Sequence, residues 1–232
     1  MTNLPAQNKL AEQIGSLWED RNNLQPGDVF ADGAIHEAIS LLDQGVERVA
    51  EFDTEGNVVI NEWLKLAILL LFRQSEMVTT EVGPFEFVDK IPLKTNYQER
   101  GVRVVPGASA RWGSYQAPGV VMMPSYINIG AYVGENTMVD TWATVGSCAQ
   151  VGRNVHLSGG VGIGGVLEPP NAIPVVIGDE CLIGSRSVVA EGARVGDGAV
   201  LGAGSILTGS IPVIDASSGE ELNRGSVPPW CV

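Results

Sequence analysis

Apolar residues recur at every sixth position through the middle of this chain. One run comprises Ile127, Val133, Val139, Val145, Val151, Leu157 and Ile163, and a second comprises Ile177, Ile183, Val189, Val195, Leu201 and Leu207. A very small residue, most often glycine, usually follows each of them. Neither a helical period of about 3.6 nor a strand period of about two produces this pattern. A six-residue period predicts a parallel β-helix, in which each hexad forms one side of a coil.

The hexads predict a mainly β fold with the β-helix proper between about Ala110 and Ile211, inside a C-terminal domain of residues 96–232. The proline-rich segment Glu168–Pro174 breaks the period, so we expect a loop extruded from the coils near residues 167–175. Loops held by a rigid scaffold are common places for ligand contacts. Asp215–Gly219 reads as a polar turn.

The first part of the chain has helical rather than hexad periodicity. Its apolar spacing predicts helices over 7–24, 33–44 and 61–72, the last with Asn61 as its N-cap. Two short apolar runs, 49–52 and 58–60, flank a polar, glycine-containing segment and predict a hairpin. We therefore expect a small α-rich domain over residues 1–95.

Composition excludes several classes of function. The formal net charge of −13 argues against a nucleic-acid surface, which needs clustered Lys and Arg. The longest apolar run, Leu66–Phe72, is too short to cross a bilayer, and a polar stretch rather than an apolar leader follows Met1–Pro5. Three cysteines without a C-x-x-C spacing favour reduced thiols and a cytoplasmic location. Two scattered histidines do not predict a metal site.

The rule that a tiny residue follows the apolar position is broken at Asn128, Asp140 and Ser158, among others. Three hexads make one coil, so Asp140 and Ser158, eighteen positions apart, are expected side by side on one edge. Glycines at 159, 160, 162, 164 and 165 would form a wall that lets backbone N–H groups approach a ligand. Asp140 is equally interpretable as a corner residue that caps neighbouring amides.

Other polar residues have alternative interpretations. His156 is a candidate general base, although its position in the hexad equally permits an outward, solvated side chain. His36 falls on a predicted helix and is expected to be structural or solvated, and Cys148 and Cys181 are expected to be small core residues. Arg153, Arg186 and Arg194 are possible anion contacts or ordinary solvated side chains.

Several longer sequence motifs are specific to one family. They are MPSYINIGAY at 123–132, MVDTWATVGSCAQ at 138–150 and NVHLSGGVGIGGVLEP at 154–169, with FVDKIPLK at 87–94 and GVRVVP at 101–106 upstream. These stretches resemble the tetrahydrodipicolinate N-succinyltransferases, a family of hexapeptide-repeat acyltransferases. The resemblance covers nearly the whole chain and extends more loosely into the N-terminal helices.

The resemblance implies a left-handed β-helix, a homotrimer with active sites in clefts between subunits, and succinyl-CoA as a co-substrate, with no permanently bound cofactor. It also implies that Arg103 binds the substrate and that Asp140 binds it and acts in catalysis. With the repeat analysis, we expect Ser158 in substrate binding and Gly160 and Gly165 beside the acyl-CoA. The activity implied is succinyl transfer to the nitrogen of ring-opened tetrahydrodipicolinate, giving N-succinyl-2-amino-6-oxopimelate and CoA in lysine and diaminopimelate synthesis.

The residue types suit this chemistry. An arginine such as Arg103 grips a carboxylate with two parallel N–H bonds. Asp140 would accept a proton from the attacking nitrogen or orient it, and the glycine wall would supply N–H donors to the tetrahedral oxyanion. Because the thiolate of CoA is a good leaving group, no covalent enzyme intermediate is needed. Positioning should then carry much of the rate enhancement.

The sequence departs from the family in two places. Val188 stands where the family is expected to carry an acidic residue after Arg-Ser, which removes the second carboxylate of a two-carboxylate mechanism. Family members are also expected to continue past the Val227-Pro228 turn with a tail that helps enclose the acyl-CoA. Two alternatives follow: an N-acetyltransferase acting on the same or a related amino diacid, and an inactive, truncated structural β-helix.

Overall fold

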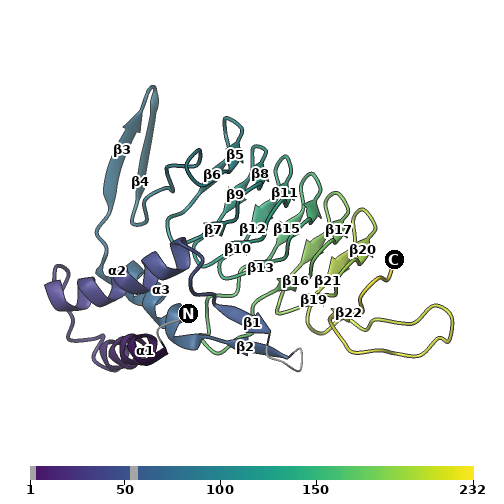
Figure 1. Ribbon diagram of the computed structural model, residues 1–232, viewed down its shortest axis with the longest axis horizontal. Helices are drawn as coiled ribbons and strands as arrows, with labels where there is room; N and C mark the ends of the chain where they lie inside the picture. Colours follow the sequence, from purple (N-terminus) through teal and green to yellow (C-terminus); the bar gives the residue numbers. More distant parts are fainter. Residues whose placement is uncertain (1–3, 53–56) are drawn as a thin grey trace.

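The computed structural model describes residues 4–52 and 57–232, and Figure 1 shows it as an α-rich region beside a long stack of coils. The helices are α1 (Leu4–Glu19), α2 (Val29–Asp43) and α3 (Glu62–Gln74). Two hairpins accompany them, β1 (Ala50–Phe52) with β2 (Val58–Ile60), and β3 (Val78–Val82) with β4 (Phe85–Asp89). The β1–β2 pairing confirms the predicted hairpin, whose connecting residues 53–56 lie outside the described residues.

The residues at the N-cap positions of α2 and α3 make different contacts. Asp28 accepts hydrogen bonds from the backbone N–H groups of Phe30 and Ala31, so α2 begins four residues earlier than predicted. Asn61 does occupy the N-cap position of α3, but its side chain makes no capping bond. It donates instead to the carbonyl of Arg48, at 2.7 Å, and so ties α3 to the end of the preceding loop.

The rest of the chain winds into a three-sided parallel β-helix, each side a six-stranded sheet. Face 1 consists of β5 (Arg103–Val104), β8 (Val121–Met122), β11 (Met138–Val139), β14 (His156–Leu157), β17 (Leu182–Ile183) and β20 (Val200–Leu201). Face 2 consists of β6 (Ser109–Ala110), β9 (Tyr126–Ile127), β12 (Thr144–Val145), β15 (Gly162–Ile163), β18 (Val188–Val189) and β21 (Ile206–Leu207). Face 3 consists of β7 (Tyr115–Gln116), β10 (Tyr132–Val133), β13 (Gln150–Val151), β16 (Val176–Ile177), β19 (Arg194–Val195) and β22 (Ser226–Val227).

The hexad pattern sets which side chains fill the coils. In most strands the first residue points outward and the second inward, where apolar side chains such as Val139, Val145, Val151 and Leu157 pack into one continuous core. The glycine after the inward residue leaves room for the next coil. A Cβ at Gly134 would lie 2.6 Å from the backbone nitrogen of Arg153. Because that contact is to backbone, the corner has no space for a larger residue.

The ends of the β-helix differ from the prediction. The first coil begins at Arg103 rather than near Ala110, because a coil strand needs only two residues and Val104 lies outside the hexad runs. After β21 the chain makes a long excursion before β22 returns to face 3, so Ser226 pairs with Arg194, 32 positions away. Asp215 makes the expected polar turn there by accepting hydrogen bonds from Ser217 and Ser218.

The extruded loop is present between β15 and β16, as the broken hexads predicted. It lengthens that coil, so His156 pairs with Leu182, 26 positions away instead of eighteen. The buried ammonium of Lys65 on α3 holds it, donating to the carbonyls of Pro169 at 3.1 Å and Ala172 at 2.8 Å. The loop is thereby fixed to the α-rich region.

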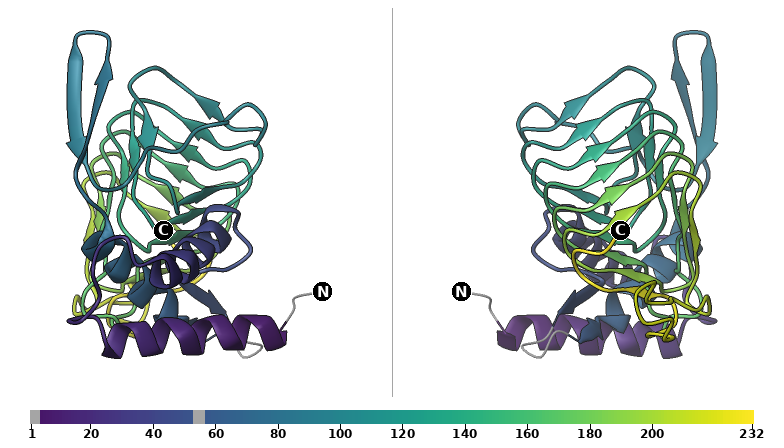
Figure 2. Two further views of the ribbon diagram at one scale, coloured as in Figure 1. Left: turned by 90° about the vertical axis from the view of Figure 1, so that its left-hand side faces the viewer. Right: turned by 90° about the vertical axis from the view of Figure 1, so that its right-hand side faces the viewer.

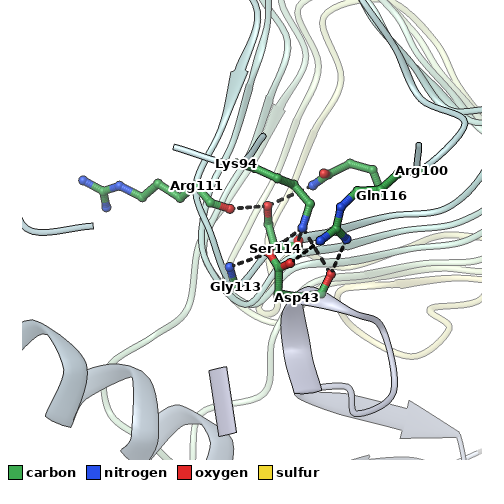
Figure 3. A network of polar contacts seen from close by, with 7 residues as sticks. All are labelled: Asp43, Lys94, Arg100, Arg111, Gly113, Ser114 and Gln116. Atoms are coloured by element: carbon green, nitrogen blue, oxygen red, sulfur yellow. Dashed lines mark hydrogen bonds and ion pairs between the residues drawn. The ribbon is translucent and has the colours of Figure 1, made fainter. Parts of the chain in front are cut away.

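The α-rich region packs on the corner between faces 2 and 3, where Ile129 and Cys148 join the apolar cluster of the helices. Beside it, the carboxylate of Asp43, at the end of α2, binds Lys94, Arg100 and the backbone N–H of Gly113 (Figure 3). Burial lowers the pKa of Lys94 to about 8, opposed by its ion pair with Asp43. A domain boundary at residue 95 remains a prediction.

The sequence analysis missed the β3–β4 hairpin. It projects away from the coils, and all but one of its strand residues are exposed (Figures 1 and 2). Val82 and Phe85 face each other across the turn, and Phe85 stacks beside Phe87. The apolar alternation in these strands is short, and the Gly83-Pro84 turn is a weak hairpin signal.

Candidate functional site

The site predicted from the repeat lies at the corner between faces 1 and 2. Asp140 follows β11 and Ser158 follows β14, and the pairing of Met138 with His156 and Val139 with Leu157 sets the two corners in register. The backbone N–H of Asp140 donates to the carbonyl of Leu157 at 3.0 Å. The expectation that residues eighteen apart stack is therefore confirmed at this corner.

The carboxylate of Asp140 binds within its own corner. Its Oδ1 accepts hydrogen bonds from the backbone N–H of Thr141 at 2.6 Å and from the Thr141 hydroxyl at 3.2 Å. The interpretation of Asp140 as a corner cap is thus correct for one oxygen. The hydrogen bond from the Thr141 amide lowers the pKa of Asp140 below its usual value, with smaller contributions from His156 and the Thr141 hydroxyl.

His156 provides the second neighbour of Asp140. Its Nε2 lies 3.5 Å from Oδ2 of Asp140, and the two side chains are 44% and 31% exposed. The sequence left the orientation of His156 open. The structure places it in the outward row of face 1, with Met138 before it and Leu182 after it, and turned toward the carboxylate.

Arg103 lies on the same face as His156 but farther along the stack. It is exposed on β5, and β8 separates it from β11. Adjacent strands are about 4.8 Å apart, so the backbone of Arg103 is roughly 10 Å from that of Met138. No hydrogen bond or ion pair joins Arg103 to Asp140, and the structure does not bring these two predicted residues into contact.

Three glycines of the wall do not provide the free N–H donors expected from the sequence. The N–H groups of Gly160, Gly162 and Gly164 donate to the carbonyls of Thr141, Ser187 and Val189 in neighbouring coils. Parallel coils use the amides of their strands to pair with each other, so these three are not available to an oxyanion. That expectation was wrong for them.

Gly160 and Gly165 lie at different corners. Gly160 has a left-handed backbone with φ of 73° and stacks on Trp142, which has φ of 63°, beside Asp140 and Ser158. Gly165 lies at the next corner, between faces 2 and 3, where a Cβ would approach the backbone nitrogen of Ser147 to 2.6 Å. Close coil packing is enough to explain glycine at 165.

Of the three arginines considered as anion contacts, Arg186 lies at the Asp140 corner. Its backbone N–H donates to the carbonyl of Gly159 at 3.0 Å, and a Cβ on Gly160 would meet its Cγ. Arg153 instead pairs with Asp179 at 3.0 Å, and Arg194 lies on face 3. Position 188, on β18 of face 2, presents an outward valine and no second carboxylate.

Sequence reasoning missed Thr141, which holds Asp140 through both its amide and its hydroxyl. The signal was available, because an Asp followed by Thr at a turn is a common local capping arrangement. The expected minor roles of other residues hold: Cys148 and Cys181 are buried, and burial raises the pKa of Cys148 to about 12. His36 is exposed and stacks near Trp112.

Within residues 4–52 and 57–232 there is no cluster of three or more His, Cys, Asp or Glu side chains arranged to hold a metal ion. Over the same part of the chain, every helix is too short or too polar to cross a membrane.

A three-sided parallel β-helix of hexads with a carboxylate, an imidazole and a hydroxyl at one corner defines a hexapeptide-repeat protein with a polar surface site. The family profile "Tetrahydrodipicolinate N-succinyltransferase N-terminal" matches residues 9–74, and "Hexapeptide repeat of succinyl-transferase" matches residues 174–209. The chain belongs to the tetrahydrodipicolinate N-succinyltransferase family, as its relatives demonstrate.

Two relatives named 2,3,4,5-tetrahydropyridine-2,6-dicarboxylate N-succinyltransferase carry that assignment. The protein from Acinetobacter baylyi is 51% identical over 232 residues, covering 97% of this chain and 84% of its own length. The protein from Methylorubrum populi is 50% identical, covering 96% of this chain and 82% of its own length. The resemblance drawn from the sequence is confirmed.

A solved structure from Campylobacter jejuni, named for a 2,3,4,5-tetrahydropyridine-2-carboxylate N-succinyltransferase, shares the fold. It is 20% identical, with a TM-score of 0.58, and the match covers 88% of this chain and 59% of that one. The expected fold, a left-handed parallel β-helix with an N-terminal helical region, is confirmed.

Proposed function

We propose that this chain transfers the succinyl group of succinyl-CoA to the nitrogen of ring-opened tetrahydrodipicolinate, in lysine and diaminopimelate synthesis. The nitrogen attacks the thioester carbonyl, a C–N bond forms, the C–S bond breaks, and CoA leaves with the proton that the nitrogen loses. The products are N-succinyl-2-amino-6-oxopimelate and CoA. The observation that carries the proposal is 51% identity across nearly the whole chain to a relative named for this activity.

We assign Asp140 to orient the attacking nitrogen. Its Oδ1 is engaged by Thr141, while Oδ2 lies beside His156 at 3.5 Å and accepts no hydrogen bond of ordinary length within the described residues. Because the pKa of Asp140 is lowered, the carboxylate is ionised at neutral pH and is a strong hydrogen-bond acceptor but a weak base. With valine at 188, this chain uses one carboxylate rather than two.

The remaining roles follow from the same corner. Ser158 lies on the coil next to Asp140 and offers a hydroxyl to the acceptor. Gly160 has no side chain, so the acyl-CoA can approach this corner closely. Arg103, exposed on face 1, binds a substrate carboxylate through its guanidinium. Gly165 lies one corner away and would contact a more distant part of the acyl-CoA.

The substrate partners are thus an acyl-CoA and a small dicarboxylate, with neither nucleic acid nor membrane involved. We also propose that the protein is a cytoplasmic homotrimer whose sites lie in clefts between subunits, and that it holds no permanent cofactor. The partly exposed position of Asp140 at a convex corner supports a second subunit as the other wall, since ligand sites are generally concave.

Thiol release from succinyl-CoA in the presence of tetrahydrodipicolinate tests the proposal, with acetyl-CoA as the competing donor. The assay should use a Cys231→Ser background, because Cys231 is the cysteine that is not fully buried. We expect succinyl-dependent release, and a loss of about 100-fold or more in an Asp140→Asn variant. Release with acetyl-CoA alone would point to the acetyltransferase alternative, and release with neither donor would contradict the proposed enzyme.

A further inference from the structure

The two oxygens of Asp140 have different surroundings. Thr141 holds Oδ1 through its amide and its hydroxyl, whereas Oδ2 has the Nε2 atom of His156 as its neighbour at 3.5 Å. The two residues come from adjacent coils, so the β-helix register itself brings them together. The carboxylate is thus bounded by its own corner on one side and by the next coil on the other.

The Nε2 atom of His156 is shielded from solvent although the ring as a whole is half exposed. It has no hydrogen-bond partner at ordinary distance within the described residues. A buried N–H without a partner is costly, and Oδ2 of Asp140 is the acceptor beside it. At 3.5 Å the contact is long, as such bonds often are before a substrate binds and closes the site.

We propose that His156 is a positioning residue that fixes the carboxylate of Asp140 for the attacking nitrogen. Its Nε2–H holds Oδ2 while Thr141 holds Oδ1, so the carboxylate plane cannot turn away when the acceptor arrives. Preorganised geometry of this kind raises the rate because the ordering is already complete before the reaction. The inference rests on the proposed function.

This role does not need His156 to change its protonation state. Nε2 donates a hydrogen bond in the imidazolium and in the neutral tautomer that carries its proton there. The residues before and after His156 in its outward row are Met138 and Leu182, which are uncharged. Asp140 is the charged group in contact with the ring among the described residues.

Two substitutions at one position separate positioning from other roles. In His156→Gln the side-chain amide places an N–H where Nε2 was, and in His156→Leu it is removed. We expect His156→Leu to lower the kcat of succinyl transfer by about 10- to 100-fold, with little change in the KM for succinyl-CoA. His156→Gln should stay within about threefold of the parent, and His36→Gln, the same change at the exposed histidine of α2, should have no effect.

A second readout does not depend on turnover. Carboxyl carbon NMR of the resting protein reports the pKa of Asp140, which should rise in His156→Leu and rise less in His156→Gln, because glutamine keeps the hydrogen bond but not the charge of the ring. If the unsubstituted protein showed no succinyl transfer, the proposed function would be contradicted. The titration of Asp140 would still test the contact between His156 and Asp140. Equal losses of kcat in both His156 variants, no loss in His156→Leu, or an unchanged Asp140 titration would each overturn the inference.

Discussion

The two carboxylate oxygens of Asp140 have different partners, so a corner cap and a proposed substrate role are compatible. One oxygen caps the corner by binding Thr141, and the other lies 3.5 Å from Nε2 of His156. The sequence predicted the pairing of Asp140 with Ser158, because an eighteen-residue coil fixes that register. It did not predict that the amides of Gly160, Gly162 and Gly164 are consumed, because hydrogen bonds between coils depend on backbone geometry rather than on residue type.

The lowered pKa of Asp140 has a consequence for the pH dependence of turnover. A carboxyl whose pKa is depressed in the folded protein stays ionised until the pH falls below its usual value of 3.8. We therefore expect kcat/KM to show no acid limb from Asp140 between pH 5 and 8. The profile of the parent should be compared with the residual activity of Asp140→Asn. A limb centred above pH 5 that disappears in that variant would contradict the assignment.

At the level of elements, the corner between faces 2 and 3 bears both the loops that leave the coils and the contacts with the helices. Both excursions, after β15 and after β21, leave between faces 2 and 3, and α3 holds the first through Lys65. The Asp43 network joins α2 to the segment before β5 and to the corner at Gly113 (Figure 3). The Asp140 corner, between faces 1 and 2, lies away from these attachments.

Removing one partner of the buried Asp43 network should destabilise the protein. Lys94→Met removes the ammonium that pairs with the carboxylate of Asp43, and both side chains are almost fully buried. Breaking such a buried pair lowers the free energy of unfolding by about 3–5 kcal/mol. Lys9→Met removes an exposed lysine from α1 and is the matched control. Chemical unfolding compares the two. A loss below about 1 kcal/mol in Lys94→Met would show that the network does not hold α2 to the β-helix.

At the scale of the whole molecule, the hexads predicted the architecture because every side of every coil needs the same two features. These are an inward apolar residue and a small residue at a tight corner. The elements outside the repeat were harder. α2 starts early because of the Asp28 cap, and the β3–β4 hairpin is almost entirely exposed. A projecting strand pair buries little in its own chain, so its apolar pattern carries a weak signal.

The placement of Arg103 illustrates the same limit for the site. The register puts Arg103 and His156 on one face but leaves β8 and β11 between their strands. The proposed role of Arg103 therefore requires a substrate or a neighbouring subunit that spans these strands. The register places Asp140 beside His156 and Ser158 of the next coil, and the side chains of Asp140 and His156 come within 3.5 Å of each other.

The most direct measurement is the fate of an isotopically labelled succinyl group. Carbon-13-labelled succinyl-CoA should be incubated with tetrahydrodipicolinate and the protein, and the product identified by mass spectrometry and nitrogen-coupled NMR. We predict one labelled succinyl group in amide linkage to the acceptor nitrogen for each CoA released, and about 100-fold less labelled product, or lower still, with Asp140→Asn. Release of CoA with the label recovered as free succinate, or no labelled amide from folded protein, would contradict the proposed function.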